Sequence, residues 1–363
     1  MKYKNNNLVK LLLNLIYDAF MREHITKWLV ILIAVAGIFP LQVLAESEHC
    51  VLLVYHRFTD DGPQSTSVSP DLFRKHLVYL KTNDFSVLPL KKVVSTLRMG
   101  GDLPDKCVSL TADDGYQSIY KSAYPLLKEF QMPMAVFVST EAIDHHYPAM
   151  MAWPQFREIS DVIDVYNHGV SHAHLVSKDA EMIVDDITAA QKRLAAELGV
   201  RTKFFAYPYG EFDQITYTQL QQLGYVGFGQ HSGAIGVDSD WLNLPRFAMA
   251  GSYAKMSSFA LKVNSLPMPV VTEQPKSMVT GEGERPLLTL KFSRAMNANE
   301  RYQFACFVAG QDAPEIIWVE KDTVTVQAKK GLTKGRSRYN CTTPSIKKGR
   351  YFWYSKPWLA KDD

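Results

Sequence analysis

The 363-residue sequence predicts an α/β protein with a small all-β region at its C-terminal end. From Cys50 to about Leu266, short apolar runs alternate with amphipathic helical stretches. This alternation is typical of parallel strands joined by helices, in an open sheet or a barrel. Residues 267–286 are then rich in Pro, Gly, Ser and Thr, and only short β-like runs follow them. The hydrophobic content of 47% suits a folded core.

The predicted elements follow one another along the chain. Strands are expected at 50–56, 107–113, 134–140, 161–168 and 204–210, and helices at 69–83, 122–131 and 179–198. The C-terminal runs at 287–293, 302–310, 316–320, 323–328 and 351–355 predict strands, enough for a small β-sandwich. We therefore expect an N-terminal targeting segment at 1–45, an α/β domain at 46–267, a linker at 268–285 and a β-rich domain at 286–363.

The N-terminus has the features of a secretory signal. Arg22 and Lys27 precede the apolar run 28–39, and Val43-Leu44-Ala45 gives a small-residue cleavage pattern. Residues 8–20 add apolar length, so an uncleaved membrane anchor is the alternative. The sequence thus predicts an exported protein, periplasmic or extracellular, with no stable membrane insertion once the signal is cleaved.

Export permits disulfides, and the four cysteines allow three full pairings. Cys50 and Cys107 each open a strand-like run, whereas Cys306 and Cys341 fall in the C-terminal part. We expect these two pairs, with buried thiols as the alternative for the first. The formal net charge of +3 leaves no strong electrostatic footprint for nucleic acid, which makes a nucleic-acid partner a poor hypothesis.

Polar residues stand at the ends of several predicted strands. Because the carboxyl ends of parallel strands share one face, such residues can meet in one site. The residues concerned are His56, Asp113 and Asp114, His168 and His172, and Tyr207 and Tyr209.

The spacing of His168 and His172 allows one cation to be bound by both. On a helical turn, residues four apart lie on the same face; the alternative is a pair of ordinary surface or core histidines. A carboxylate from another strand end would complete the three protein ligands of a catalytic zinc site. If Asp114 is that ligand, Asp113 stays free to act as a general base.

These residues bring the sequence close to a known family. Thr111 to Gly115 (TADDG) is similar to the Thr-Phe-Asp-Asp-Gly motif of the polysaccharide deacetylases, carbohydrate esterase family four. His168 to His172 matches the paired-histidine motif of that family, and Tyr207 to Gly210 overlaps its Arg-x-Pro-Tyr-Gly motif. The stretches 205–210 and 244–247 resemble the branch that deacetylates poly-β-1,6-N-acetylglucosamine in biofilm systems. The resemblance covers about residues 50 to 250.

The resemblance implies a distorted (β/α) barrel and a metal-dependent N-deacetylase, with Zn²⁺ as the expected metal. The partner would be an N-acetylglucosamine polymer or oligomer, from which acetate is released. By the family pattern, Asp114, His168 and His172 bind the metal, and Asp113 is the base. The backbone N–H of Tyr209 would stabilise the oxyanion.

Three features depart from the family pattern, and the first is Ala112, which stands where phenylalanine is usual. Ala206 stands where the motif arginine is expected, and we expect Arg246 to supply that charge, with a surface arginine as the alternative. The late histidine motif is not evident after residue 250; the run 51–56 resembles it, which makes His56 the candidate acid and His231 its competitor.

Other interpretations remain open at this point. Glycoside hydrolysis needs two carboxylates on opposite sides of the scissile bond, about 5 Å or more apart, which adjacent residues do not suit. A secreted carbohydrate-binding protein that kept the fold but lost turnover is the main alternative. Trp153 and Trp241 are candidates for a sugar groove or for core packing, and His145, His146 and His174 for surface or supporting positions. The sequence fixes no oligomeric state.

Overall fold

The computed structural model describes residues 46–362. The predicted signal or anchor at 1–45 lies outside the described residues. Within 46–362, no helix is both long and apolar enough to cross a membrane.

The centre of the α/β part is a sheet of parallel strands in the order β11-β10-β9-β8-β7-β2. β13 extends it in parallel beside β2, β12 pairs with β2 in the antiparallel sense, and β5 pairs with β7. The bounds are β2 His49–Tyr55, β5 Ser86–Val87, β7 Cys107–Asp114, β8 Met134–Val138, β9 Ile163–Asn167, β10 Phe204–Ala206, β11 Val226–Phe228, β12 Ala234–Gly236 and β13 Phe247–Ala248.

The two edges of this sheet approach each other without closing a continuous barrel. An isolated parallel bridge joins Phe228, at the end of β11, to Leu244. Three residues later β13 pairs with β2 at the opposite edge. The segment 244–248 therefore spans the seam. The predicted α/β class is confirmed, and the distortion of the expected barrel lies at this seam.

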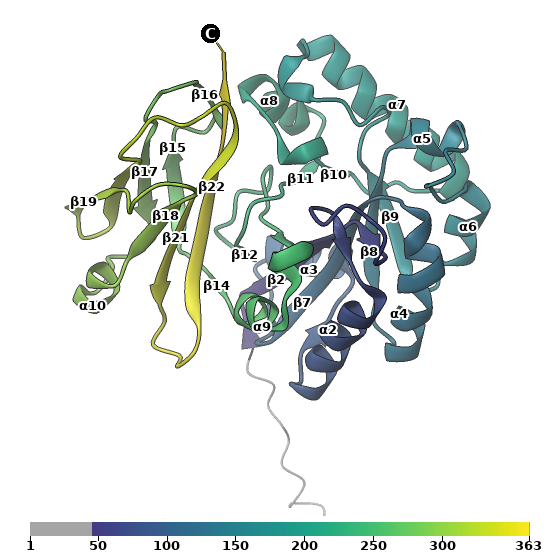
Figure 1. Cartoon of the computed structure of the whole chain (residues 1–363), viewed down its shortest axis with the longest axis horizontal. Helices are drawn as coiled ribbons and strands as arrows, with labels where there is room; N and C mark the ends of the chain where they lie inside the picture. Colours follow the sequence, from purple (N-terminus) through teal and green to yellow (C-terminus); the bar gives the residue numbers. More distant parts are fainter. Residues whose placement is uncertain (1–45, 363) are drawn as a thin grey trace, which may run out of the picture. The chain divides into compact units, whose positions relative to one another are not determined.

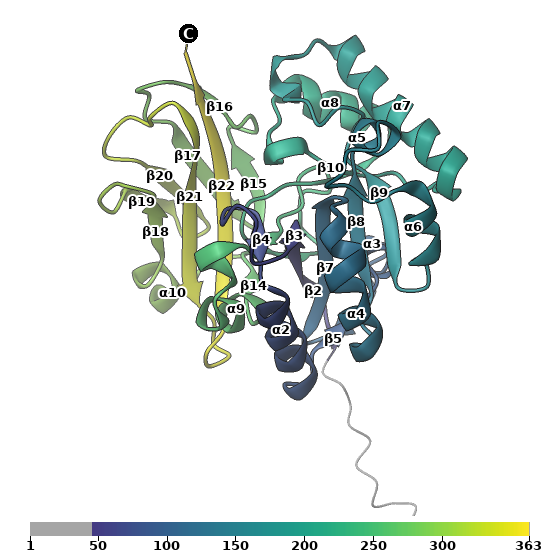
Figure 2. The same cartoon turned by 45° about the vertical axis from the view of Figure 1, so that its right-hand side comes forward.

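Helices cover the outer side of the sheet. In both views α4, α6 and α7 lie outside β8 and β9 (Figures 1 and 2). The helices are α2 Pro70–Thr82, α3 Leu90–Arg98, α4 Tyr124–Phe130, α5 Thr140–Asp144, α6 Trp153–Glu158, α7 Ala180–Leu198, α8 Gln214–Gln222, α9 Met256–Val263 and α10 Ala298–Tyr302. Ser69 and Asp179 cap the first turns of α2 and α7 by accepting hydrogen bonds from the amides of Leu72 and Met182, as short polar N-cap residues do.

The strands of the sheet are buried on both faces. In β2, Leu52 packs into one hydrophobic cluster, and Leu53 packs into the other. Successive strand side chains point to opposite faces, so an uninterrupted apolar run is what a strand covered on both sides requires. This explains why β2 reads as a continuous hydrophobic stretch in the sequence.

The C-terminal part forms two further sheets, ordered β14-β22-β21-β18 and β15-β17-β20-β19, with β16 beside β22. Their strands are β14 Leu266–Pro267, β15 Val270–Gln274, β16 Val279–Gly281, β17 Leu287–Phe292, β18 Ala305–Val308, β19 Glu315–Glu320, β20 Thr323–Gln327, β21 Gly335–Pro344 and β22 Tyr351–Lys361. The long hairpin β21–β22 is the yellow ribbon of Figure 1. Both sheets contribute to one hydrophobic cluster, and the predicted all-β C-terminal domain is confirmed. Residues 270–274 and 279–281, within the stretch expected to be a linker, are strands of these sheets.

Short strand pairs complete the description: β1 Glu46–Ser47 with β6 Leu103–Pro104, and β3 Arg57–Phe58 with β4 Ser67–Val68.

Both predicted disulfides are present. Cys50 is bonded to Cys107, which ties the start of β2 to the start of β7, and Cys306 is bonded to Cys341 across β18 and β21. The alternative of free buried thiols for the first pair is therefore wrong.

Candidate active site

The predicted metal ligands converge at the carboxyl ends of β7 and β9. One ligand atom from each of Asp114, His168 and His172 lies within 4.8 Å of the others. The Nε2 atoms of His168 and His172 lie 3.4 and 3.2 Å from Oδ1 of Asp114. In a tetrahedral site with metal–ligand bonds of 2.0–2.1 Å, two ligand atoms stand about 3.3 Å apart. The spacing of this triad fits a small divalent cation.

Two atoms of the triad have no hydrogen-bond partner among the described residues. Oδ1 of Asp114 and Nε2 of His168 are buried and make no hydrogen bond. Nδ1 of His168 lies 2.8 Å from the carbonyl oxygen of Ala206, so this nitrogen carries the proton and donates it. That bond fixes the ring and leaves Nε2 with a lone pair directed at Asp114, the arrangement that carbonyl groups impose on metal-binding histidines.

The expectation of a helical turn between the two histidines is wrong. Residues 168–172 form an irregular loop after β9, with Gly169 at φ 81° and His172 at φ 55°. Asn167 anchors the loop by accepting a hydrogen bond from the Gly169 amide. The left-handed turn, not helical periodicity, brings the second imidazole back to the first.

Left-handed backbone is concentrated at this site. Among the described non-glycine residues, six have positive φ, and three of them are Asp114 (73°), His172 (55°) and Tyr209 (61°). Such conformations are unfavourable for residues with a Cβ and tend to occur where function requires them.

Asp113 is held by Arg246. Nη1 and Nη2 of the arginine donate to Oδ1 and Oδ2 of Asp113 at 2.7 and 2.8 Å, and both side chains are fully buried. Burial by itself raises the pKa of Asp113, but the Arg246 charge and hydrogen bonds outweigh burial and hold that pKa below its usual value. Asp113 is therefore ionised at neutral pH.

Arg246 is itself fixed in place. It donates through Nε to the Gly229 carbonyl at 2.9 Å and through Nη1 to the Thr111 hydroxyl at 3.1 Å. Gln230, which sequence reasoning missed, donates from Nε2 to Oδ2 of Asp113 at 3.2 Å. It follows β11 at the strand end, so the strand-end argument that found the other residues applies to it as well.

His56 follows β2 and is half-buried at the same edge of the sheet. Burial lowers the pKa of its imidazole below the usual value, although the nearby carboxylates of Asp113 and Asp114 oppose this. His56 thus experiences the charges of the site that contains the two aspartates.

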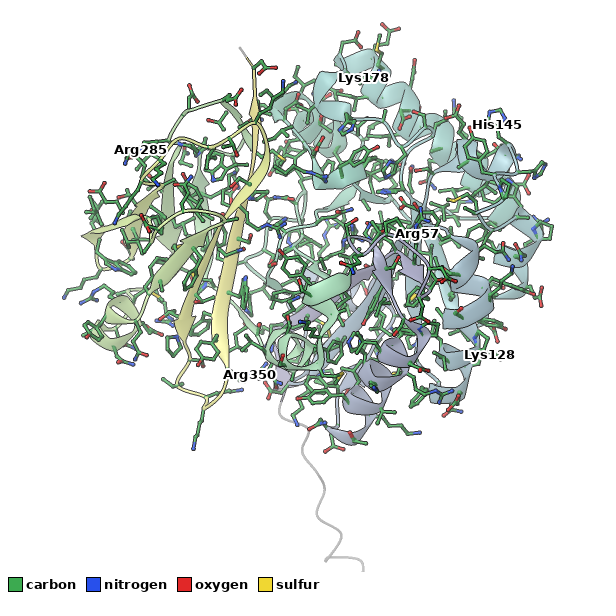
Figure 3. The ribbon with its side chains drawn as sticks, viewed as in Figure 1. Arg57, Lys128, His145, Lys178, Arg285 and Arg350 are labelled. Carbon is green, nitrogen blue, oxygen red and sulfur yellow. A yellow bond between two sulfur atoms is a disulfide. The ribbon has the colours of Figure 1, made fainter. Side chains whose placement is uncertain are left out.

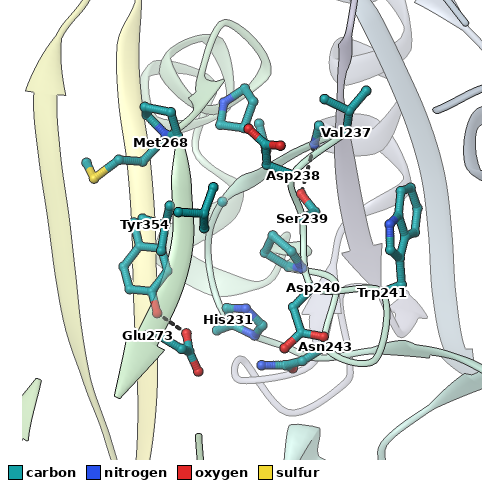
Figure 4. Close-up of a pocket in the computed structure, with 18 of the residues that line it drawn as sticks. His231, Val237, Asp238, Ser239, Asp240, Trp241, Asn243, Met268, Glu273 and Tyr354 are labelled. Carbon is teal, nitrogen blue, oxygen red and sulfur yellow. Dashed lines mark hydrogen bonds between the residues drawn. The ribbon is translucent and has the colours of Figure 1, made fainter. Parts of the chain in front are cut away.

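His231 has a different position. It lines a cavity of about 760 Å³ with Asp240, Trp241 and Asn243, and no member of the Asp114, His168 and His172 triad lines that cavity. Figure 4 shows His231 beside Asp240 and Asn243. Burial lowers the pKa of His231 to about 3, so the imidazole is neutral at physiological pH. This environment favours His56 over His231 as a proton donor.

The tryptophans and histidines that the sequence left as candidates for a sugar groove or a supporting position lie in different places. Trp153 is buried and donates from Nε1 to Asp144, which is a packing position, and Trp241 lies in the cavity just described. His145 is exposed, and Figure 3 shows it at the periphery, beside α5. His146 is also exposed. His174, in contrast, stacks on the ring of Tyr209 with 3.9 Å between centroids.

The sequence and the fold were compared with those of known proteins. Residues 100–228 match the family described as polysaccharide deacetylase. The poly-β-1,6-N-acetyl-D-glucosamine N-deacetylase of Escherichia coli is 24% identical over 259 residues, which cover 59% of this chain and 38% of that enzyme. The match thus spans well under half the length of that relative.

Two solved structures share the fold. The deacetylase PplD of Streptococcus pyogenes, in complex with acetate, superposes with a TM-score of 0.55 at 24% identity, covering 59% of this chain and 98% of that chain. IcaB from Ammonifex degensii gives 0.54 at 24% identity, with 60% and 98% covered. The predicted resemblance is therefore supported by the match of residues 100–228 to the polysaccharide deacetylase family, and the two solved structures, at 24% identity, show a shared fold.

Proposed function

We propose that this protein is a metal-dependent N-deacetylase that hydrolyses the N-acetyl groups of an N-acetylglucosamine-containing polysaccharide and releases acetate. The observation that carries the proposal is the triad of Asp114, His168 and His172 directly beside the ionised pair of Asp113 and Arg246. The relatives named as poly-β-1,6-N-acetyl-D-glucosamine N-deacetylases support the substrate class.

The triad would hold the divalent cation, and its two nitrogens and one oxygen suit Zn²⁺. Such an ion supplies Lewis acidity, which acidifies water and polarises a carbonyl group. The fixed Nδ1–H bond of His168 and the left-handed turn at His172 hold the two imidazoles ready for it.

Asp113 would accept the proton of the attacking water. As a buried ionised carboxylate it has the required free lone pairs, and its two hydrogen bonds to Arg246 fix its orientation. The same bonds reduce its basicity, so Arg246 would keep the resting carboxylate ionised and oriented while lowering its affinity for the proton.

His56 would donate a proton to the departing nitrogen, because an amine anion is a very poor leaving group. Its lowered pKa makes the protonated form scarce at neutral pH but a stronger acid when it is present. The backbone N–H of Tyr209 would stabilise the negative charge that develops on the carbonyl oxygen.

The binding-protein alternative rests on the replaced motif arginine and on the extra β-domain. The contact between Arg246 and Asp113 weakens the first of these reasons. The two disulfides agree with an oxidising compartment, and we propose export to the periplasm or cell exterior, with an N-terminal anchor as the alternative.

Acetate release tests the proposal. The full chain should release acetate from linkage-defined N-acetylglucosamine oligomers, lose this activity with a chelator, and recover it when Zn²⁺ is restored. The Asp113→Asn variant serves as the control for contaminating activity. No acetate from any β-1,6- or β-1,4-linked oligomer, with the metal bound, would contradict the proposed function.

A further inference from the structure

One residue of the C-terminal β-sheets reaches the candidate active site. Arg336, near the start of β21, donates from Nη1 to the carbonyl oxygen of Tyr209 at 3.1 Å. Its Nε lies 3.6 Å from Oε1 of Glu211, and its guanidinium carbon lies 5.7 Å from the centre of the Tyr209 ring. The contact joins residues 127 positions apart in the sequence.

Glu211 extends this contact to the other side of Tyr209. Its Oε2 lies 2.6 Å from Nδ1 of His174, and the carboxylate is almost fully buried. The His174 ring lies parallel to the Tyr209 ring, at 3.9 Å and 3°. Arg336 thus acts on Tyr209 directly at the backbone, and through Glu211 and His174 at the ring.

Tyr209 needs such support. It has φ 61° and ψ 2°, a left-handed conformation that is unfavourable for a residue with a Cβ. Residues in this region persist when several contacts determine them together. The edge-on contact of the Tyr209 ring with His172, at 4.5 Å between centroids, carries any displacement of the tyrosine to a candidate metal ligand.

We propose that Arg336 is a positioning residue, and that the C-terminal β-domain completes the active site by holding Tyr209 in its left-handed conformation. The proposal rests on the proposed function, because the backbone N–H of Tyr209 is there the oxyanion donor. It gives the β-domain a role at the active site.

The experiment compares Arg336→Ala with Arg338→Ala. Arg338 lies two residues further along β21, on the same face of the strand, and its side chain makes no hydrogen bond or ion pair among those seen in residues 46–362. Removing an oxyanion donor outright costs about 10²–10³ in kcat, so a loosened donor should cost roughly tenfold or more. We expect kcat to fall by that factor in Arg336→Ala with KM little changed, partial rescue in Arg336→Lys, and no change in Arg338→Ala.

A second measurement is independent of turnover. The amides of Gly210 and Glu211 bond to the carbonyls of Tyr207 and Pro208, so hydrogen exchange reports on this turn. Exchange at both amides should be faster in Arg336→Ala than in the wild type or Arg338→Ala, while the melting temperatures stay alike. Equal exchange and equal kcat in the two alanine variants would overturn the proposal. If the wild type releases no acetate, the proposed function fails, and the exchange comparison alone decides whether Arg336 holds Tyr209.

Discussion

Replacing Arg246 by methionine tests whether the buried ion pair with Asp113 organises the site. Both side chains have no exposed surface, and the arginine donates four hydrogen bonds, two of them to the Asp113 carboxylate. Removing one partner of such a pair leaves an uncompensated buried charge, which costs about 3–5 kcal/mol. We expect Arg246→Met to lower the free energy of unfolding at pH 7 by that amount.

A double variant separates the electrostatic part of this stability loss from the part due to packing. In Arg246→Met with Asp113→Asn neither position of this pair carries a charge, so the loss should shrink to roughly 1–2 kcal/mol from packing and the unpaired Gly229 carbonyl. Urea denaturation of the wild type, the two single variants and the double variant gives the coupling energy between Arg246 and Asp113. A chelator in every sample removes any stabilisation by bound metal. Arg74→Met is the matched control, because Arg74 makes the same two-pronged contact with Glu129 on the surface, and its loss should change stability far less.

The pH dependence of the free energy of unfolding provides a second test of this ion pair. In the wild type, the lowered pKa of Asp113 adds stability that is complete above the ordinary value of 3.8 and disappears as the pH falls through the folded-state value. Without Arg246, burial raises this pKa and only the charges of His168 and His56 still lower it, so the stability that Asp113 adds above pH 3.8 should shrink. Additive losses in the double variant, or an unchanged pH slope, would refute the assignment of Arg246 as the partner that keeps Asp113 ionised.

Three further predictions concern the metal, a buried histidine and a disulfide. Asp114→Ala should lose bound metal along with activity, whereas Asp113→Asn should keep the metal and lose most activity; equal metal content by elemental analysis would contradict this division of roles. Burial lowers the pKa of His76 to about 4, so the protein should lose up to about 3 kcal/mol of stability as the pH falls from 6.5 towards 4. In His76→Gln, the free energy of unfolding from denaturation curves should fall by that much less over the same pH range. Replacing Cys306 and Cys341 together by serine opens a loop with a sequence separation of 35 and should lower stability by up to about 4 kcal/mol, measured against the same protein with the Cys50–Cys107 bond intact.

The sequence predicted the strand ends well because one rule governs them all. Each apolar run in the α/β part became a buried strand, and in parallel sheets the residues that follow must share an edge. The loop geometry was beyond this reasoning. Nothing in the spacing of His168 and His172 distinguishes a helical turn from a left-handed loop, since both bring the rings together. Arg336 was also out of reach, because a contact between residues 127 positions apart leaves no local pattern.

The contact of Arg246 with Asp113, which we propose replaces that of the motif arginine, follows from the geometry of the seam. At position 206 a small residue is sufficient, because what this position gives the site is its backbone carbonyl, which accepts the His168 Nδ1–H bond. The charge comes instead from residue 246, in the segment whose flanks pair with β11 on one side and β2 on the other. From there Arg246 bonds to the Gly229 carbonyl beyond β11, to Thr111 in β7 and to Asp113. One side chain therefore connects the edges of the incomplete barrel and orients the proposed base, so a change that loosens the seam should also disorder Asp113.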